Sequence, residues 1–400
     1  MNSRRKFITS SAAFASLAAL PSSARSKVIS LSNTPQLVAL GRPRIITKNP
    51  SAYHGWPTVT RRQNGELLLV YSGGREGHIC PFGRVELMRS RDDGRTWSDP
   101  AVLLDGPIDY RDAGILETAK STILVTTFTS LAYVPILEKA IRESAWPQDR
   151  IDRWLAIHNQ LTDTERHRLL GQWIIRSEDG GQTWSEQYPS IVNSPHGPIQ
   201  LADGRLLHAG KAIWTENGRT GFCVSLDDGN SWEWLADIPV RPGDKIEHYH
   251  ELHCVETRSG KLITHIRNHN PRNLGETLQS ESSDGGATWT APRSIGVLGH
   301  PSHLIRLADD SLFMSYGYRK APFGNQARVS PDEGKTWSQP FRISNDGTNW
   351  DLGYPSSVQL PSGNLLSIWY ELKEKNAKAK LYASPFKLLT YPEAAPQNNA

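Results

Sequence analysis

Residues 90–97 read SRDDGRTW, and the pattern Ser-x-Asp-x-Gly-x-(Thr or Ser)-Trp returns at Ser177, Ser225, Ser282 and Ser330. Each position in the repeat has a physical role. The Asp carboxylate accepts hydrogen bonds from the backbone of its own turn, the Gly supplies a positive φ, and the Trp packs the turn onto its sheet. Each copy therefore predicts a β-hairpin turn whose Asp is structural and not catalytic.

A second unit alternates with the first and consists of a polar turn followed by an apolar strand. Its copies lie at residues 64–67, 203–206, 259–262, 309–312 and 362–365, with a weaker copy at 120–125. Six such units predict an all-β fold, a six-bladed β-propeller with four strands in each blade.

The first two hairpin motifs are 87 residues apart, whereas the later ones follow at 48, 57 and 48 residues. The long interval indicates an insertion in the second blade at about residues 131–170. Its apolar residues recur at helical spacing, which predicts two helices. These helices are expected to act as a packing flap or, alternatively, as a lid that shapes a pocket.

Composition narrows the functional classes. The 400 residues are 38% hydrophobic and 22% charged, which excludes a disordered chain and suits one propeller domain over residues 25–400. A net charge of +4 is too small to indicate a nucleic-acid partner. No apolar run reaches the roughly 18 to 20 residues of a membrane-spanning helix, so no membrane span is expected.

The N-terminus has the pattern of a targeting segment. Arg4 and Arg5 precede an apolar run that ends near Leu20, and small residues follow it. This predicts a twin-arginine signal peptide over residues 1–24 and export to the periplasm or the medium; a flexible N-terminal arm is the alternative.

No cofactor or metal is expected. Cys80, Cys223 and Cys254 are widely spaced without a C-x-x-C pair, which excludes a zinc ribbon and favours buried free thiols. In HYHELH, residues 248–253, an unbroken strand would place the first two histidines on one face and His253 on the other. That spacing is poor for three ligands from one strand; the alternatives are a bulge in this strand or ligands from different blades.

Alignment of the blades on the polar turns gives candidate site residues. Seven to ten residues before these turns stand His54, Asp112, His196, His250 with Glu251, His300 and Tyr354. Equivalent ends of the inner strands converge at one mouth of a propeller, so these side chains are expected around one pocket. Any single histidine could instead be a structural hydrogen-bonding residue.

The hairpin motif is the Asp-box, and its alternation with the second unit over residues 42–382 resembles the sialidase (neuraminidase) superfamily. That family holds a sugar carboxylate with three arginines and uses a tyrosine nucleophile paired with a glutamate. The resemblance implies that Tyr354, in GYPS (353–356), is the nucleophile and that Glu251 is its partner. Arg267 and Arg319 resemble the second and third arginines, and HGPIQ (196–200) resembles the third-blade strand.

Two positions depart from the family pattern. Where the family has its first arginine, this chain reads YHGWP (53–57), which contains Trp56. Where the family has its acid/base aspartate, this chain reads GREGH (74–78), and His78 is nearest the expected place. The resemblance therefore implies a carboxylate clamp with two of the three arginines and a histidine as the proton donor.

The resulting hypothesis is an exo-acting glycoside hydrolase on a terminal sugar of an acidic glycan. Tyr354 and Glu251 are the expected catalytic pair, and His78 or His54 handles the proton. The expected substrate-binding residues are Arg267, Arg319, Arg75, His196, His250, His300 and Trp56. Alternatives are a polysaccharide lyase or an α-rhamnosidase-like enzyme that acts at uronate residues, and a carbohydrate-binding propeller without activity.

Overall fold

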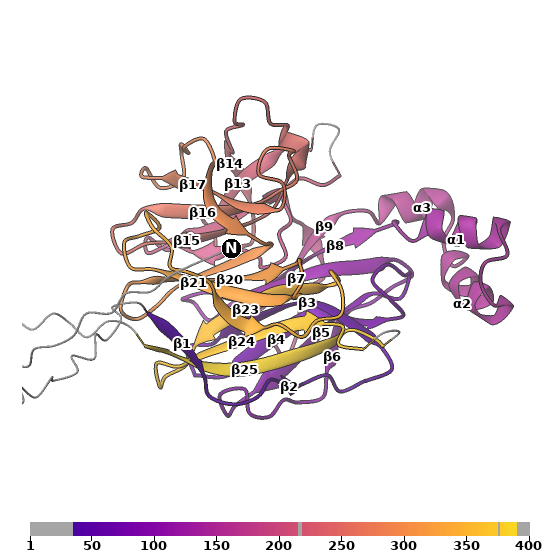
Figure 1. Cartoon of the computed structure of the whole chain (residues 1–400). Helices are drawn as coiled ribbons and strands as arrows, with labels where there is room; N and C mark the ends of the chain where they lie inside the picture. The colour runs from indigo at the N-terminus through magenta and orange to yellow at the C-terminus, as the bar shows by residue number, and fades with distance from the viewer. Residues whose placement is uncertain (1–34, 215–217, 375–376, 390–400) are drawn as a thin grey trace, which may run out of the picture. The chain divides into compact units, whose positions relative to one another are not determined.

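The computed structural model describes residues 35–214, 218–374 and 377–389. Within these residues the strands form six antiparallel sheets, the blades of a propeller (Figure 1). The expected signal peptide, residues 1–24, lies outside these ranges. Blades 1 to 3 contain β3 (Tyr53–Arg61), β4 (Leu67–Arg75), β5 (Arg84–Ser90) and β6 (Ala101–Leu104); β7 (Asp109–Glu117), β8 (Ile123–Ser130), β9 (Gln172–Ser177) and β10 (Tyr188–Pro189); and β11 (Ile199–Gln200), β12 (Leu206–Lys211), β13 (Thr220–Ser225) and β14 (Glu233–Asp237). Blades 4 to 6 contain β15 (Tyr249–Glu256), β16 (Leu262–Asn268), β17 (Glu276–Ser282) and β18 (Arg293–Leu298); β19 (Ser302–Arg306), β20 (Leu312–Tyr318), β21 (Gly324–Ser330) and β22 (Phe341–Ser344); and β23 (Leu352–Gln359), β24 (Leu365–Glu371) and β25 (Lys380–Leu389).

The two ends of the described chain close the ring together. The N-terminal strands β1 (Gln36–Ala39) and β2 (Arg44–Ile45) both pair antiparallel with β25, the last strand of the chain. Blade 6 therefore combines strands from both ends of the chain, and its inner strand β23 packs against β3 of blade 1. This closure covers an edge that an open sheet would leave unpaired. The prediction of a six-bladed propeller is confirmed.

The Asp-boxes connect the third and fourth strands in blades 1 to 5, as hairpin turns. In the first copy, Asp92 accepts hydrogen bonds from the backbone N–H of Thr96 (2.8 Å), the Thr96 hydroxyl (2.6 Å) and the Ser90 hydroxyl (2.8 Å). Gly94 has a φ of +76°. The same bonds recur in the other four copies. The Asp-box carboxylates are therefore bound within their own turns, as predicted.

The strand order places the Asp-boxes away from the mouth at which the inner strands begin. An inner strand starts at the mouth and the second strand returns to it, so the turn between them lies on the opposite face. The third strand then runs away from the mouth and ends in the Asp-box. Residues that begin inner strands or end second strands are consequently the ones available for a site at the mouth.

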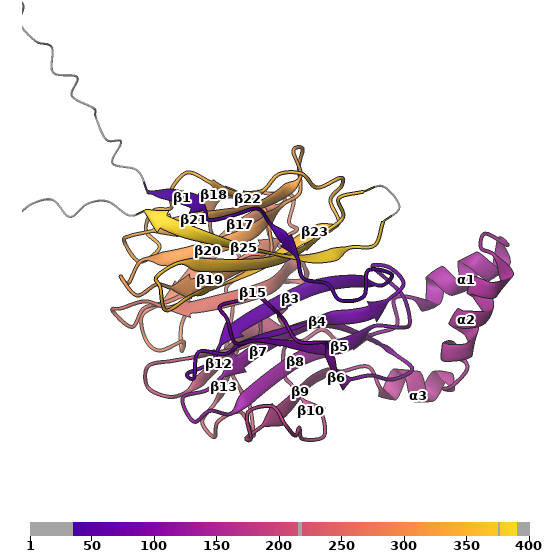
Figure 2. The same ribbon diagram turned by 90° about the horizontal axis from the view of Figure 1, so that it is seen from below.

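The insertion in blade 2 lies between β8 and β9 and extends from the side of the propeller (Figure 2). It contains α1 (Val134–Arg142), α2 (Gln148–His158) and α3 (Asp163–Arg168), one helix more than predicted. The additional helix is short and begins with a capping box between Thr162 and Glu165, a local signal that hydrophobic periodicity does not detect. Tyr133, Leu137 and Trp154 are the centre of its apolar core.

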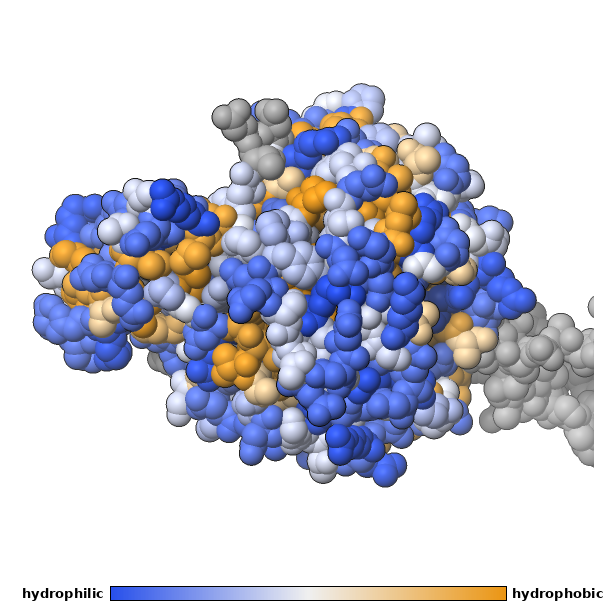
Figure 3. Space-filling view, turned by 180° about the vertical axis from the view of Figure 1, so that it is seen from behind, coloured by the Kyte–Doolittle hydropathy of each residue, from blue (hydrophilic) through white to orange (hydrophobic). Residues whose placement is uncertain are grey.

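That core reaches the propeller through Cys80, which is buried in the same cluster. Apolar side chains gather in the helical region in the view from behind, among hydrophilic ones (Figure 3). All three cysteines are buried and free, as predicted. Within the described ranges, no helix is long and apolar enough to cross a membrane.

Candidate active site

Four inner strands are interrupted by β-bulges that hold a residue other than glycine at positive φ. These residues are Trp56 (φ +54°), Asp112 (+47°), Glu251 (+44°) and Tyr354 (+51°), on blades 1, 2, 4 and 6. Residues with a side chain rarely adopt this backbone conformation because it is sterically strained, and such strain concentrates at functional sites. The bulges turn these four side chains toward one place.

That place is a cavity of about 310 Å³ at the mouth of the propeller. This volume is at the lower end of the range of small-molecule sites, roughly 300 to 1,000 Å³. The cavity is lined by Trp56, His78, Arg111, Asp112, Phe128, Ser130, Ala132, Glu251, Arg267, Arg319, Trp350 and Tyr354. Six of the eleven predicted site residues are therefore brought together here.

A hydrogen-bonded cluster of Tyr354, Glu251 and Arg267 forms one wall. The Tyr354 hydroxyl donates to Glu251 Oε1 at 2.7 Å, and Arg267 Nη1 donates to both Glu251 oxygens at 2.8 and 2.7 Å. Arg267 Nη1 also donates to the Tyr354 oxygen at 3.0 Å. The phenol thus has a carboxylate as proton acceptor and a cation beside its oxygen.

The pKa directions fit these positions. Burial and the negative charge of Glu251 raise the pKa of Tyr354. Burial also opposes ionisation of Glu251, but the charge and hydrogen bonds of Arg267 outweigh it and lower the pKa of Glu251. Burial and the charge of Glu251 raise the pKa of Asp112. Near neutral pH Glu251 is accordingly a carboxylate that can accept a proton, and Asp112 is the carboxyl group that is more easily protonated.

His78 stands on the opposite wall and is held by Asp351. Its Nδ1–H donates to Asp351 Oδ1 at 2.8 Å, and the hydroxyls of Tyr53 and Tyr370 donate to the same oxygen at 2.9 and 3.1 Å. Nε2 has no hydrogen-bond partner among the described residues, and the side chain is 32% exposed. Burial lowers the pKa of His78, and Asp351 partly offsets the effect. A carboxylate that fixes Nδ1–H leaves Nε2 to exchange protons with a ligand.

Of the three arginines named from the sequence, Arg267 and Arg319 line the cavity and Arg75 does not. Arg75 is 1% exposed and donates to both oxygens of Asp109 at 2.5 and 3.0 Å. The structure therefore does not bring Arg75 to the cavity, because this ion pair uses the guanidinium inside the protein. Arg319 donates to the backbone carbonyl of Leu352 at 3.1 Å.

The expected ring of four imidazoles at this cavity is not present. His54 is buried and its ring bonds the Ala52 carbonyl (3.0 Å), while His196 lies in a separate buried group with His253 and His303. The bulges explain the difference: each advances the register by a residue or two, so that Trp56 rather than His54 faces the cavity.

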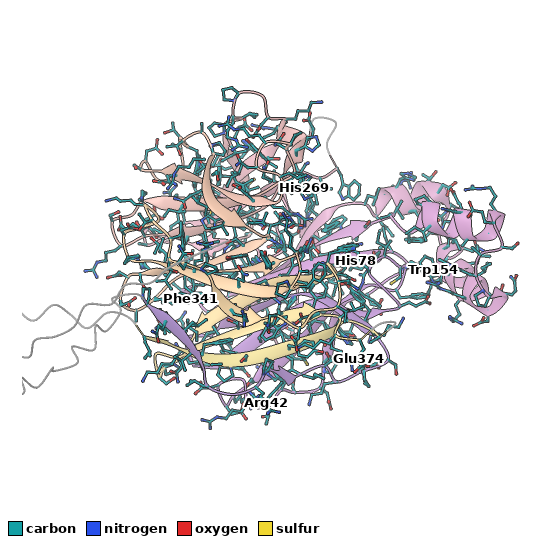
Figure 4. The ribbon with its side chains drawn as sticks, viewed as in Figure 1. Arg42, His78, Trp154, His269, Phe341 and Glu374 are labelled. Carbon is teal, nitrogen blue, oxygen red and sulfur yellow. The ribbon has the colours of Figure 1, made fainter. Side chains whose placement is uncertain are left out.

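His250 and His300 are not among the residues that line the cavity. Their rings flank His269, with centroid distances of 4.8 and 5.7 Å, and His269 Nε2 accepts a hydrogen bond from Arg267 Nε at 2.9 Å. Figure 4 labels His269. In blade 4 the bulge brings Glu251 to the cavity in place of His250. The structure therefore does not bring the predicted site residues His54, His196, His250 and His300 to the cavity.

No metal or cofactor chemistry is assigned to the site. Among residues 35–214, 218–374 and 377–389, no group of three or more His, Cys, Asp or Glu residues is arranged to hold a metal ion. A larger hollow of about 640 Å³, lined by Arg62, Glu66 and Arg89 among others, lies elsewhere on the propeller. Its charges already pair with one another, as Arg62 and Arg89 do with Glu66 at 2.9 and 3.1 Å.

Side chains of the insertion contact Glu76, two residues before His78. Figure 4 labels His78 and, in the insertion, Trp154. Glu76 pairs with Arg150 of α2 and accepts a hydrogen bond from Trp154 Nε1 at 3.2 Å. Ser130 and Ala132, where the chain enters the insertion, line the cavity. The helices of the insertion thus contact the His78 loop through Glu76, and none of their residues lines the cavity.

Arg111, Trp350 and Asp351 were missed by the sequence analysis. Arg111 directly precedes Asp112, which the blade alignment had selected, and the other two lie four and three residues before Tyr354. A wider window around the aligned positions would have included all three. The sequence carries no signal that Asp351 would meet His78, because 273 residues separate them.

Comparison with known proteins agrees with the fold. Residues 144–366 match the sequence model of the BNR repeat-like domain. A sialidase of Bacteroides fragilis is 24% identical over 347 residues, which cover 79% of this chain and 59% of that protein. The chain thus spans little more than half the length of this relative.

Two solved structures share the propeller at lower identity. A protein of unknown function from Dyadobacter fermentans is 22% identical with a TM-score of 0.74, and the match covers 88% of this chain and 99% of that one. The intramolecular trans-sialidase of Ruminococcus gnavus is 14% identical with a TM-score of 0.61, and the match covers 84% and 94% of the two chains. At these identities the likeness establishes the fold alone.

Proposed function

Since the chain belongs to the family of BNR repeat-like domains, with the propeller of the sialidase superfamily, we propose that it is an exo-acting glycoside hydrolase. Its substrate is a terminal sugar of an acidic glycan. The observation that carries the proposal is the contact set of Tyr354, Glu251 and Arg267 inside a cavity that also contains His78.

The first step breaks the glycosidic bond. Glu251 takes the proton of Tyr354 while the phenol oxygen attacks the anomeric carbon, which converts a weak nucleophile into an effective one. The bond to the leaving oxygen breaks as protonated His78 gives that oxygen its proton from Nε2. The products of this step are the shortened glycan and a sugar joined to Tyr354. Arg267 stabilises the negative charge that develops on the phenol oxygen.

The second step returns the enzyme to its starting state. Neutral His78 removes a proton from a water molecule, whose oxygen attacks the anomeric carbon. The bond to Tyr354 breaks, and the phenol recovers its proton from Glu251. Two displacements at one carbon retain the anomeric configuration. A phenol is a suitable nucleophile where the sugar carries a carboxylate near the anomeric carbon, because the neutral group avoids repulsion between like charges.

Sugar release from a panel of substrates tests the proposal. The panel contains fluorogenic α-sialosides, β-glucuronides, α-rhamnosides and neutral hexosides, and Tyr354→Phe is measured beside the wild type. We expect release from an acidic glycoside that falls by at least about 10³-fold in Tyr354→Phe, within the range reported when a catalytic group is removed. Tyr318→Phe is the control, because Tyr318 is a tyrosine outside the cavity.

Other outcomes point to the alternatives. A product with a new carbon–carbon double bond, detected by ultraviolet absorbance on a uronate polysaccharide, would replace hydrolysis by lyase chemistry. Binding of an acidic glycan without turnover, unchanged in Tyr354→Phe, would make the propeller a binding module. Either result contradicts the proposed hydrolase.

We also propose that the protein is exported, which would bring it to extracellular glycans. The support is the Arg4–Arg5 pair, the apolar run that follows it and the small residues near Ala24. Mass spectrometry of the mature protein from the periplasm or medium tests this, with an N-terminus near Arg25 expected and an intact Met1 contradicting it.

A further inference from the structure

Trp56 lines the cavity, and two arginines, Arg75 and Arg111, stack on its indole ring. The guanidinium carbon of Arg111 lies 4.4 Å from the centroid of the indole, and that of Arg75 lies 4.8 Å from it. Trp56 itself is 1% exposed and held at positive φ on its bulge. An indole in this position cannot bind an anion, but its π face can orient a cation beside it.

The two arginines differ in the partners that they already have. Arg75 is buried, and Asp109 receives two of its hydrogen bonds. The nearest carboxylate oxygen to Arg111 is Asp109 Oδ2, at 3.6 Å, and this oxygen already accepts from Arg75 at 3.0 Å. The Arg111 side chain is 11% exposed and lines the cavity. Arg111 is therefore the arginine of the pair that can bind a ligand.

The charges around the cavity favour an anion. Arg111, Arg267 and Arg319 bring three positive charges, and Glu251 is the one lining carboxylate with a lowered pKa. Burial raises the pKa of Asp112, so its carboxyl group is less fully ionised and offsets less of the positive charge of the three arginines. Arg267 is neutralised by Glu251, whereas Arg319 donates to the Leu352 carbonyl. Among the described residues, Arg319 has no carboxylate partner within 4 Å, and Arg111 has only the Asp109 oxygen at 3.6 Å, which it shares with Arg75.

We propose that Arg111, held on the ring of Trp56, is a substrate-binding arginine that restores a three-arginine site for a sugar carboxylate. The third arginine would come from β7 of blade 2 instead of from the bulge of blade 1. This inference rests on the proposed function for the identity of the ligand as a sugar. Arginine suits the role because its planar guanidinium can bind a carboxylate through two parallel hydrogen bonds.

Direct binding, measured by isothermal titration calorimetry, tests the inference without any need for turnover. The probes are the methyl glycosides of N-acetylneuraminic acid and glucuronic acid, each compared with its neutral methyl ester. The wild type is expected to bind one of the acids more tightly than its ester. Arg111→Met is expected to lose about 10- to 100-fold in affinity for that acid, as for loss of hydrogen bonds to a charged group. Binding of the ester should change by less than about twofold, because the ester carries no charge for Arg111 to pair with.

Arg219→Met is the matched control. Arg219 also stacks on a tryptophan, with its guanidinium carbon 3.9 Å from the ring centroid of Trp234, but it lies outside the cavity and pairs with Asp237. This variant should bind both probes as the wild type does. Thermal unfolding of both variants verifies that the propeller is intact.

The results separate this inference from the proposed function. A preference of the wild type for the acid that disappears in Arg111→Met supports the inference, even if no glycoside is cleaved. A wild type that cleaves glycosides while Arg111→Met keeps the full preference for the acid overturns the inference alone. A wild type that binds each acid no more tightly than its ester also overturns it.

Discussion

Replacement of Asp351 by asparagine should shift the pH dependence of activity, because Asp351 positions the proposed proton donor. Its Oδ1 accepts a hydrogen bond from His78 Nδ1 at 2.8 Å, in a place where only 14% of the Asp351 side chain is exposed. The asparagine side chain would remove the negative charge but keep a carbonyl oxygen for Tyr53 and Tyr370. Substitution therefore weakens protonation of His78 more than it weakens packing.

The magnitude follows from the hydrogen bond. A hydrogen bond to a charged group contributes about 1.5–3 kcal/mol, and about 1.4 kcal/mol corresponds to one pKa unit. The pKa of His78 should therefore fall by about one to two units in Asp351→Asn. Burial already lowers the pKa of His78 below its ordinary value, so at neutral pH the protonated form of His78 is the minor one. A further fall of one to two units reduces that fraction, and kcat/KM at pH 7, by about 10- to 100-fold.

The assay is kcat/KM from pH 4 to 8 on the best glycoside, with Asp346→Asn as control. Asp346 is an exposed carboxylate near Asp351 in sequence that pairs with Lys373 at 2.6 Å, outside the cavity. We expect the basic limb to move to lower pH in Asp351→Asn alone. The same shift should appear in the His78 ring signals by NMR, which requires no substrate. An unchanged limb and an unchanged His78 pKa would refute the positioning role.

Three further predictions concern stability. Burial lowers the pKa of His208 to about 3, so the unfolded state binds a proton at this histidine more readily than the folded state does. The free energy of unfolding therefore decreases as the pH falls from about 6.5 toward 3. The change in this free energy caused by His208→Leu, measured by urea unfolding, should be about 2 kcal/mol more favourable at pH 5 than at pH 8. Gly114→Ala would place a Cβ 2.6 Å from the Cα of Gly197 and should destabilise by about 1–3 kcal/mol, whereas Gly41→Ala, with open space around it, should not. Glu76→Gln weakens the ion pairs with α2, and limited proteolysis should cut the insertion faster without loss of the propeller.

The fold could be predicted because its signals are local and repeated. Each Asp-box makes its hydrogen bonds within a few residues, so the sequence of one turn contains nearly everything that defines the turn. Five copies at blade-like spacing then leave few alternatives to a propeller. The number of helices in the insertion was underestimated because α3 is short and depends on a cap rather than on apolar periodicity.

The site was predictable only in part, because bulges decide which side chains enter the cavity. Tyr354 and Glu251 were selected correctly as members of one cluster. The same alignment also selected His54, which lies two residues from Trp56, the side chain that the bulge turns inward. Alignment of the blades treats the strands as regular, so it does not locate a bulge or the side chain that the bulge turns inward.

Contacts between distant residues limited the prediction in the same way. Asp351 of blade 6 makes a hydrogen bond with His78 of blade 1, and Arg111 of blade 2 stacks on Trp56 of blade 1. Both residues carry ordinary charged side chains, and their placement follows from how the blades assemble.

The most direct test of the account is the identity of the residue that bonds to the sugar. A fluorinated glycosyl fluoride of the sugar that the enzyme releases slows the second step, so the covalent intermediate can be digested and sequenced by mass spectrometry. The account predicts the added sugar on Tyr354 and none on Tyr354→Phe. A sugar on Glu251 or Asp112, or an unsaturated product without any adduct, would contradict it.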